Sequence, residues 1–126
     1  MHRVMGFGLV ALAMGATLIP VISSQAQTAP AAPPAFAACR ACHSVQPGGK
    51  SGLGPNLNGV VGRTAGTLLG FNYSNAVKAS KLKLDEKALD EYLAAPTKKI
   101  PGSRMPIATP DPAKRAAIIA YLKSVK

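Results

Sequence analysis

Two thiols and an imidazole lie within five consecutive residues of the chain, Cys39-Arg40-Ala41-Cys42-His43. Two residues between the cysteines set the thiols one helical turn apart, which matches the separation of the porphyrin vinyl groups to which such thiols add. His43 follows directly, so its imidazole can swing to the iron. The pattern is typical of covalent haem c attachment, and we expect one haem at Cys39 and Cys42 with His43 as an axial iron ligand.

Other uses of a Cys-x-x-Cys pair need partners that the sequence does not supply. A thioredoxin-like redox pair belongs to a βαβ unit, and no strand pattern occurs in the chain. A zinc site would need two further ligands. Two cysteines this close also cannot tie distant segments together as a disulfide framework. Haem attachment is therefore the favoured interpretation.

The N-terminus has the pattern of an export signal. The stretch from Val4 to Ile22 is apolar and uncharged with Pro20 near its end, and Ser24 and Ala26 satisfy the small-x-small rule for cleavage. We expect residues 1–26 to be a cleaved signal peptide and the remaining protein to be periplasmic. The alternative is that residues 4–22 stay as a membrane anchor, since a span needs ~20 apolar residues.

Removal of the signal peptide limits the candidates for the second axial iron ligand. It would take away His2 and three of the four Met residues, which leaves Met105, a lysine, or a position that is open or held by water. Met105 lies in a polar loop bounded by Pro101 and Pro106, where methionine makes a poor core filler. A thioether ligand raises the reduction potential and leaves no vacant position on the iron. That ligation suits an electron carrier and not an enzyme.

The charge of the chain restricts its partners. It holds 15 Lys and Arg against 5 Asp and Glu, a net charge of +10, and loss of residues 1–26 removes only Arg3 and leaves +9. We expect no nucleic acid binding, because the protein is exported and its basic residues form no long run interleaved with aromatics. An acidic protein surface or an anionic membrane fits better.

Short helices and long loops must position the residues that would bind the haem. Residues 27–35 form a linker rich in Ala and Pro, and Pro34 could start a helix that continues over Phe36–Cys42. Residues 47–70 are rich in glycine and keep neither helical nor alternating periodicity. So long a loop is uncommon in a small domain unless something else, such as a buried cofactor, holds it.

Two further helices are expected towards the C-terminus. Asp85 caps the first, which must end near Ala95 because Pro96 disfavours helix at the preceding residue. Asp111 caps the second, which runs to about Val125, and a proline-rich loop joins the two. The apolar faces are Ala88, Leu89, Tyr92 and Leu93 in the first helix and Ile118, Ile119, Leu122 and Val125 in the second.

Large apolar residues are scarce. The chain has no Trp and, without residues 1–26, two Phe and three Tyr. A domain of this size buries only ~60–70% of its unfolded surface. Three short helices would leave the centre thinly filled, so we expect the haem to be part of the core.

The sequence resembles the class I cytochrome c family from Phe36 to Lys123. The resemblance rests on the ordered motifs Cys39-x-x-Cys-His43, Gly54-Pro-Asn-Leu57, Gly62-Arg63, Gly70-Phe-Asn-Tyr-Ser74, Pro101-Gly-Ser-Arg-Met105 and Ile-Ala-Tyr121-Leu122. It implies a cytochrome c domain over residues 36–126, with an all-α small cytochrome c fold of three to four short helices and long loops around one haem. The implied function is that of a soluble, monomeric one-electron carrier and not an enzyme.

The same resemblance assigns roles around the haem. The Pro55 carbonyl should accept the ring proton of His43. Arg63, Tyr73 and Ser103 should contact a haem propionate. Tyr92 should approach the Met105 sulfur. Alternative roles are plain packing for Tyr92 and ordinary solvation for Arg63 and Tyr73.

Departures from the family concern the surroundings of the site. Leu84 stands where a tryptophan commonly donates to a propionate, and the proline-rich start replaces most of the usual N-terminal helix. Ala38, Gly52 and Thr97 replace lysines that mitochondrial relatives often use for docking. Candidates for a docking ring are Lys50, Lys98, Lys99 and Arg104.

The resemblance implies acidic redox partners of several kinds, namely a cytochrome bc-type complex, a terminal oxidase, a reaction centre or a dehydrogenase. Membrane contact would come through such partners unless residues 4–22 are an anchor. Two alternatives stay open: a haem subunit or anchored cytochrome dedicated to one dehydrogenase or oxidase, and a haem sensor or enzyme with an open sixth position.

Overall fold

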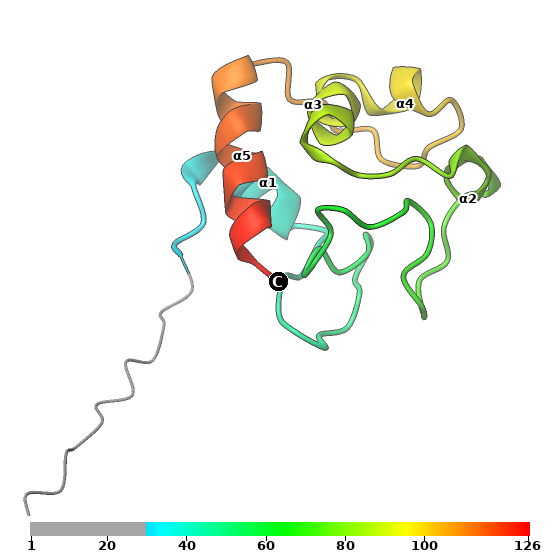
Figure 1. Cartoon of the computed structure of the whole chain (residues 1–126), viewed down its shortest axis with the longest axis horizontal. Helices are drawn as coiled ribbons and strands as arrows, with labels where there is room; N and C mark the ends of the chain where they lie inside the picture. Colours follow the sequence, from blue (N-terminus) through cyan, green and yellow to red (C-terminus); the bar gives the residue numbers. More distant parts are fainter. Residues whose placement is uncertain (1–29) are drawn as a thin grey trace, which may run out of the picture.

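The computed structural model describes residues 30–126, which fold as short helices joined by long loops (Figure 1). The helical elements are the 3-10 turn η1 (Pro34–Phe36) and the α-helices α1 (Ala37–Arg40), α2 (Asn75–Ser80), α3 (Glu86–Ala94), α4 (Pro96–Lys99) and α5 (Pro112–Ser124). This part of the chain has no strand, only an isolated antiparallel bridge between Thr64 and Lys83. The all-α prediction is confirmed, with five α-helices where three to four were expected.

The two helices that the sequence analysis did not predict, α2 and α4, have local causes. The Ser74 side chain caps α2 by accepting a hydrogen bond from the Val77 N–H at 3.2 Å. Helix α4 lies in the segment predicted to be only a loop. Ala95, before Pro96, is extended at φ −157° and ψ 81°, which ends α3. Pro96 then supplies the fixed φ that suits the first turn of the next helix.

The predicted caps of the longer helices are confirmed. Asp85 accepts a hydrogen bond from the Ala88 N–H at 2.8 Å, and Asp111 accepts one from the Ala113 N–H at 2.8 Å. Pro112 occupies the first turn of α5. At the N-terminal end the predicted helix over Phe36–Cys42 is shorter than expected, because η1 and α1 together stop at Arg40.

The core lies where α5 packs against α3 and η1 (Figure 1). Phe36 of η1 and Ile118 of α5 are fully buried, and the Phe36 ring meets the ring of Tyr121 with 4.8 Å between centroids. Tyr121 was not on the predicted apolar face. The other members of this cluster are Val60, Leu89, Leu93, Ile119, Leu122 and Val125.

The predicted signal peptide, residues 1–26, and the start of the linker over 27–35 lie outside the described residues. Among residues 30–126, no helix combines the length and the apolar content that crossing a bilayer requires.

Candidate functional site

The two cysteines sit one helical turn apart, as their spacing predicts. Cys39 lies in α1, and its carbonyl accepts hydrogen bonds from the N–H of Cys42 at 3.1 Å and of His43 at 2.9 Å. No disulfide joins the thiols, and both residues are half-buried. Burial raises the pKa of the Cys39 thiol, and the neighbouring Cys42 acts in the same direction. Because no disulfide joins them, both thiols are available for covalent attachment.

The His43 ring is oriented by the backbone of the loop that follows it. Its Nδ1 lies 2.7 Å from the Pro55 carbonyl oxygen, so the ring proton is donated there and Nε2 is left free for a metal. A Cβ at Gly54 would lie 2.3 Å from Cε1 and within 2.8 Å of Nδ1 and Nε2. Only glycine allows the backbone to approach the ring this closely. The predicted hydrogen bond from His43 to Pro55 is confirmed.

Asn56, next to Pro55, organises this loop and was missed by the sequence analysis. Its side chain is 5% exposed, and its Nδ2 donates to the carbonyls of Gln46 and Gly49, both at 2.8 Å. Its Oδ1 accepts from the Asn58 N–H at 2.7 Å. The available signal was a polar side chain beside the histidine's acceptor in a loop without secondary structure, where carbonyls need partners.

Arg63 joins the same network. Its guanidinium donates to the Asn56 carbonyl at 3.0 Å and to the Asn58 carbonyl, so it is not a freely solvated charge. Tyr73 lies close by: burial raises the pKa of its hydroxyl, and the positive charge of Arg63 opposes the shift. The structure thus brings Arg63 and Tyr73 together, while their contact with a propionate stays a prediction.

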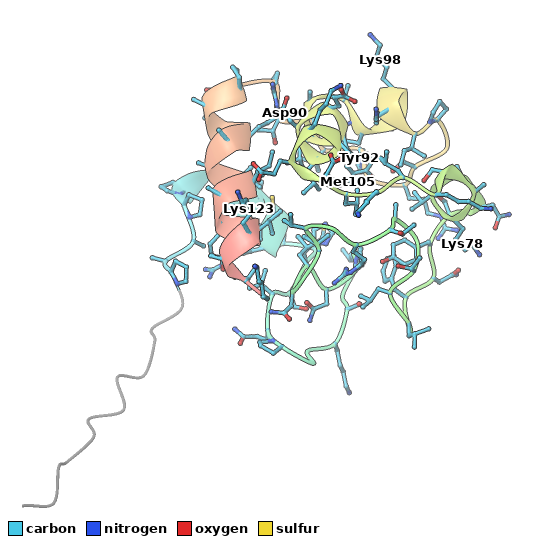
Figure 2. All side chains as sticks on the ribbon, in the orientation of Figure 1. Lys78, Asp90, Tyr92, Lys98, Met105 and Lys123 are labelled. Carbon is cyan, nitrogen blue, oxygen red and sulfur yellow. The ribbon has the colours of Figure 1, made fainter. Side chains whose placement is uncertain are left out.

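The Met105 side is built differently. Figure 2 shows Tyr92 and Met105 near each other below α3, and Met105 is half-buried against the core cluster. The Tyr92 hydroxyl lies 2.7 Å from Ser103 Oγ, and burial raises the pKa of Tyr92 while this bond lowers it. Ser103 Oγ also accepts from the Met105 N–H at 3.4 Å. The Tyr92 contact with the Met105 sulfur and the Ser103 contact with a propionate stay predictions.

Leu84, where the family commonly has tryptophan, is half-buried against the core. Its N–H donates to the Arg63 carbonyl at 2.9 Å, and its carbonyl accepts from the Gly62 N–H at 2.8 Å. An apolar residue is thus paired through its backbone with the segment that carries Arg63.

These residues fit a covalently held haem. The thiols are one turn apart, the Gly54 backbone leaves room for an imidazole whose Nε2 is free, and a thioether lies in a loop packed on the core. A small all-α domain with this site belongs to the class of c-type haem proteins.

The comparisons with known proteins agree. The sequence matches the profile of the family described as Cytochrome c over residues 34–126, and the chain belongs to the cytochrome c family. It is 55% identical to cytochrome c2 iso-2 of Magnetospirillum fulvum over 95 residues, which cover 75% of this chain and 98% of that one. It is 42% identical to cytochrome c2 of Blastochloris viridis over 122 residues, which cover 96% of this chain and 92% of that one.

A solved structure gives the same result. Cytochrome cH from Methylobacterium extorquens superimposes with a TM-score of 0.66 at 47% sequence identity, covering 71% of this chain and 90% of that one. The fold and the family together establish that the chain carries one covalently attached haem c and transfers electrons, and that it is not an enzyme. Redox carriers of this kind exchange electrons with redox complexes.

Proposed function

We propose that Cys39 and Cys42 hold the haem, that His43 and Met105 are its axial iron ligands, and that the protein carries single electrons between redox complexes of the periplasm. The observation that carries this proposal is the His43 ring, held by the Pro55 carbonyl at 2.7 Å against a backbone that only glycine allows. The haem supplies a reversible one-electron change at its iron. The protein keeps that change free of bond making and breaking.

The side chains act by positioning and by filling coordination sites. Pro55 holds the Nδ1 proton of His43, which fixes the ring and makes Nε2 the better ligand. Met105 would fill the remaining coordination position of the iron, so small molecules would find no vacant site. Arg63 would neutralise a propionate, and the hydroxyls of Tyr73 and Ser103 would orient it by hydrogen bonds.

The ligation is tested with visible spectra of both oxidation states and with carbon monoxide. We expect a weak far-red band in the oxidised protein, which reports the bond from iron to sulfur, and no carbon monoxide binding by the reduced protein. Met105→Leu should lose the band and admit carbon monoxide. A wild-type protein that lacks the band or binds carbon monoxide would overturn the ligation and reopen the sensor or enzyme alternative.

We propose further that residues 1–26 are a cleaved signal that directs the protein to the periplasm. The support is the uncharged stretch from Val4 to Ile22 followed by the small residues Ser24 and Ala26. N-terminal sequencing of the purified protein should start at Gln27. A protein that retains Arg3 and stays with the membrane fraction would instead be the anchored form.

Acidic surfaces of redox partners are the proposed docking sites. All five carboxylates of the chain serve as helix caps or ion-pair partners; they are Asp85, Glu86, Asp90, Glu91 and Asp111. None pairs with Lys50, Lys98 or Arg104, and Figure 2 shows Lys98 projecting away from the molecule. Lys99 differs, because it pairs with Glu91, whose pKa it lowers.

Salt dependence tests the docking. Electrostatic steering raises association rates and fades as ionic strength rises. We expect the electron-transfer rate with an acidic partner to fall steeply as the salt concentration rises. At low salt, Lys98→Gln should react more slowly than the wild type. Lys114→Gln on α5 is the matched control and should behave like the wild type. Rates that do not depend on salt would contradict the steering.

A further inference from the structure

A buried arginine lies where the Met105 loop joins α5. Only 12% of the Arg115 side chain is exposed, and its Nε donates to Asp90 Oδ1 of α3 at 2.7 Å. Its Nη1 donates to the carbonyls of Thr109 and Pro110 at 3.1 and 2.7 Å. One guanidinium therefore joins α5, α3 and the end of the loop, which suits its rigid fork of donors.

The loop itself is held mainly near its two ends. At one end the Ser103 hydroxyl is paired with Tyr92 of α3 at 2.7 Å, and at the other the Thr109 N–H donates to the Leu93 carbonyl of α3 at 2.7 Å. Between these two points the described bonds are long: the Met105 N–H and the Arg104 guanidinium each reach an acceptor only at 3.4 Å.

The residues next to Met105 add few contacts with the rest of the fold. Pro106 has a fixed φ but no N–H to donate. Ile107 is 54% exposed, so its side chain adds little packing. Apart from the packing of the Met105 side chain against the core cluster, the loop is fixed at its two end attachments, and Arg115 holds the one nearer to α5.

We propose that Arg115 is a positioning residue for the sixth ligand: by holding Thr109 and Pro110 beside α3, it keeps Met105 on the iron and keeps external ligands off. This inference rests on the proposed ligation by Met105. The two carbonyls accept from a charged donor, and such hydrogen bonds are stronger than neutral ones. Asp90 balances the buried charge, which would otherwise be costly.

The fold contains a natural control for this role. Lys123 of α5 pairs with Glu86 of α3 at 2.5 Å, so it also joins these two helices. Its side chain is 50% exposed and that of Glu86 is 60% exposed, and the described contacts of Lys123 include no atom of the Met105 loop. Loss of this pair weakens the same helix contact without releasing the loop.

The test compares Arg115→Gln, Arg115→Lys and Lys123→Gln as haem-loaded proteins. Imidazole competes with the thioether for ferric iron, and its affinity is measured by titration of the visible spectrum. We expect Arg115→Gln to bind imidazole about tenfold more tightly than the wild type, which corresponds to the loss of one charged hydrogen bond. Lys123→Gln should stay within about twofold of the wild type by the same scale.

Arg115→Lys keeps the charge beside Asp90 but lacks the fork that reaches the carbonyls, so its imidazole affinity should also rise above that of Lys123→Gln. This variant decides the question if Arg115→Gln fails to accumulate with haem. Equal affinities for the Arg115 and Lys123 variants would overturn the positioning role alone. A wild-type protein without the far-red band would overturn the ligation by Met105 and this inference together.

Discussion

The loop that follows His43 and the loop that carries Met105, the two proposed iron ligands, are held in opposite ways. Residues 44–58, which follow His43, are tied to one another: the Leu57 N–H donates to the Ser44 carbonyl at 2.8 Å, and Asn56 bridges three backbone groups. Residues 101–110, which carry Met105, are tied at their ends to α3 and α5. The first loop is organised mainly by residues within it and by the nearby Arg63, and the second by distant parts of the fold.

This difference implies that the two proposed ligands would not be displaced from the iron with equal ease. Loss of contacts between helices leaves the His43 loop intact, since its bonds are local. The same loss releases the ends of the Met105 loop. We therefore expect the thioether to be the first ligand displaced when the protein is weakened, and the following changes test that asymmetry.

Gly54→Ala should have the largest effect. The new Cβ would lie 2.3 Å from His43 Cε1, and the ring cannot turn away without losing the Pro55 carbonyl. We expect most haem-loaded protein to be lost, measured as haem absorbance per milligram of purified protein. Gly70→Ala is the control, since its φ of +80° strains the backbone by about 1–2 kcal/mol while no atom lies within 4 Å of the new Cβ. Equal yields would contradict the close fit at His43.

Asn56→Ala should destabilise the His43 side without touching the sixth ligand. It removes a buried side chain that donates to the carbonyls of Gln46 and Gly49 and accepts from the Asn58 N–H, so we expect a loss of about 2–3 kcal/mol in the free energy of unfolding. Denaturant unfolding measures the loss, and the far-red band should persist in the folded variant. The exposed Asn72→Ala should stay within about 0.5 kcal/mol of the wild type.

Tyr92→Phe should give a smaller change on the Met105 side. It removes the hydroxyl that pairs with Ser103, at a cost of about 1 kcal/mol in unfolding free energy. Imidazole affinity should rise with it, because one end of the loop is released. Tyr121→Phe serves as the control, since residues 30–126 show no partner for its hydroxyl; a variant pair with equal imidazole affinities would contradict the role of Tyr92.

The smallest expected effect concerns how the free energy of unfolding depends on pH above pH 10, where Tyr92 loses its proton. Burial raises the pKa of Tyr92 above its usual 10.0, so the folded state holds the phenol proton more tightly than the unfolded chain does. This contribution is complete below pH 10.0 and is lost as the pH rises through the folded value. The fall in unfolding free energy above pH 10 should therefore be shallower in Tyr92→Phe. If the unfolding free energies of the wild type and Tyr92→Phe fall in parallel above pH 10, Tyr92 does not contribute to this pH dependence.

The sequence predicted the features that depend on neighbouring residues. Asp85 and Asp111 cap helices through N–H groups two or three residues away, and Pro96 ends one helix at the residue before it. The one-turn spacing of Cys39 and Cys42 is equally local. The resemblance to a family added the Pro55 carbonyl, twelve residues from its partner His43.

Side chains that bind backbone carbonyls of loops, or a carboxylate far along the chain, were missed. Arg115 reaches Asp90 across 25 positions, and no periodicity marks such a pair. Asn56 looked like an ordinary turn residue because its acceptors are carbonyls, which every residue possesses. Helix α2 was missed because six residues with none buried carry no apolar stripe.

The network around Asn56 also bears on how this protein can diverge. The frame of residues 44–58 uses the side chains of Ser44, Ser51, Asn56 and Asn58, and their bonds go largely to main-chain atoms. Lys50 and Leu53 face the solvent, and Leu53 is 84% exposed. Mutation can therefore change the charge and shape of this outer surface while the histidine stays in place. A lineage can exchange one redox partner for another at these positions and keep its iron site unaltered.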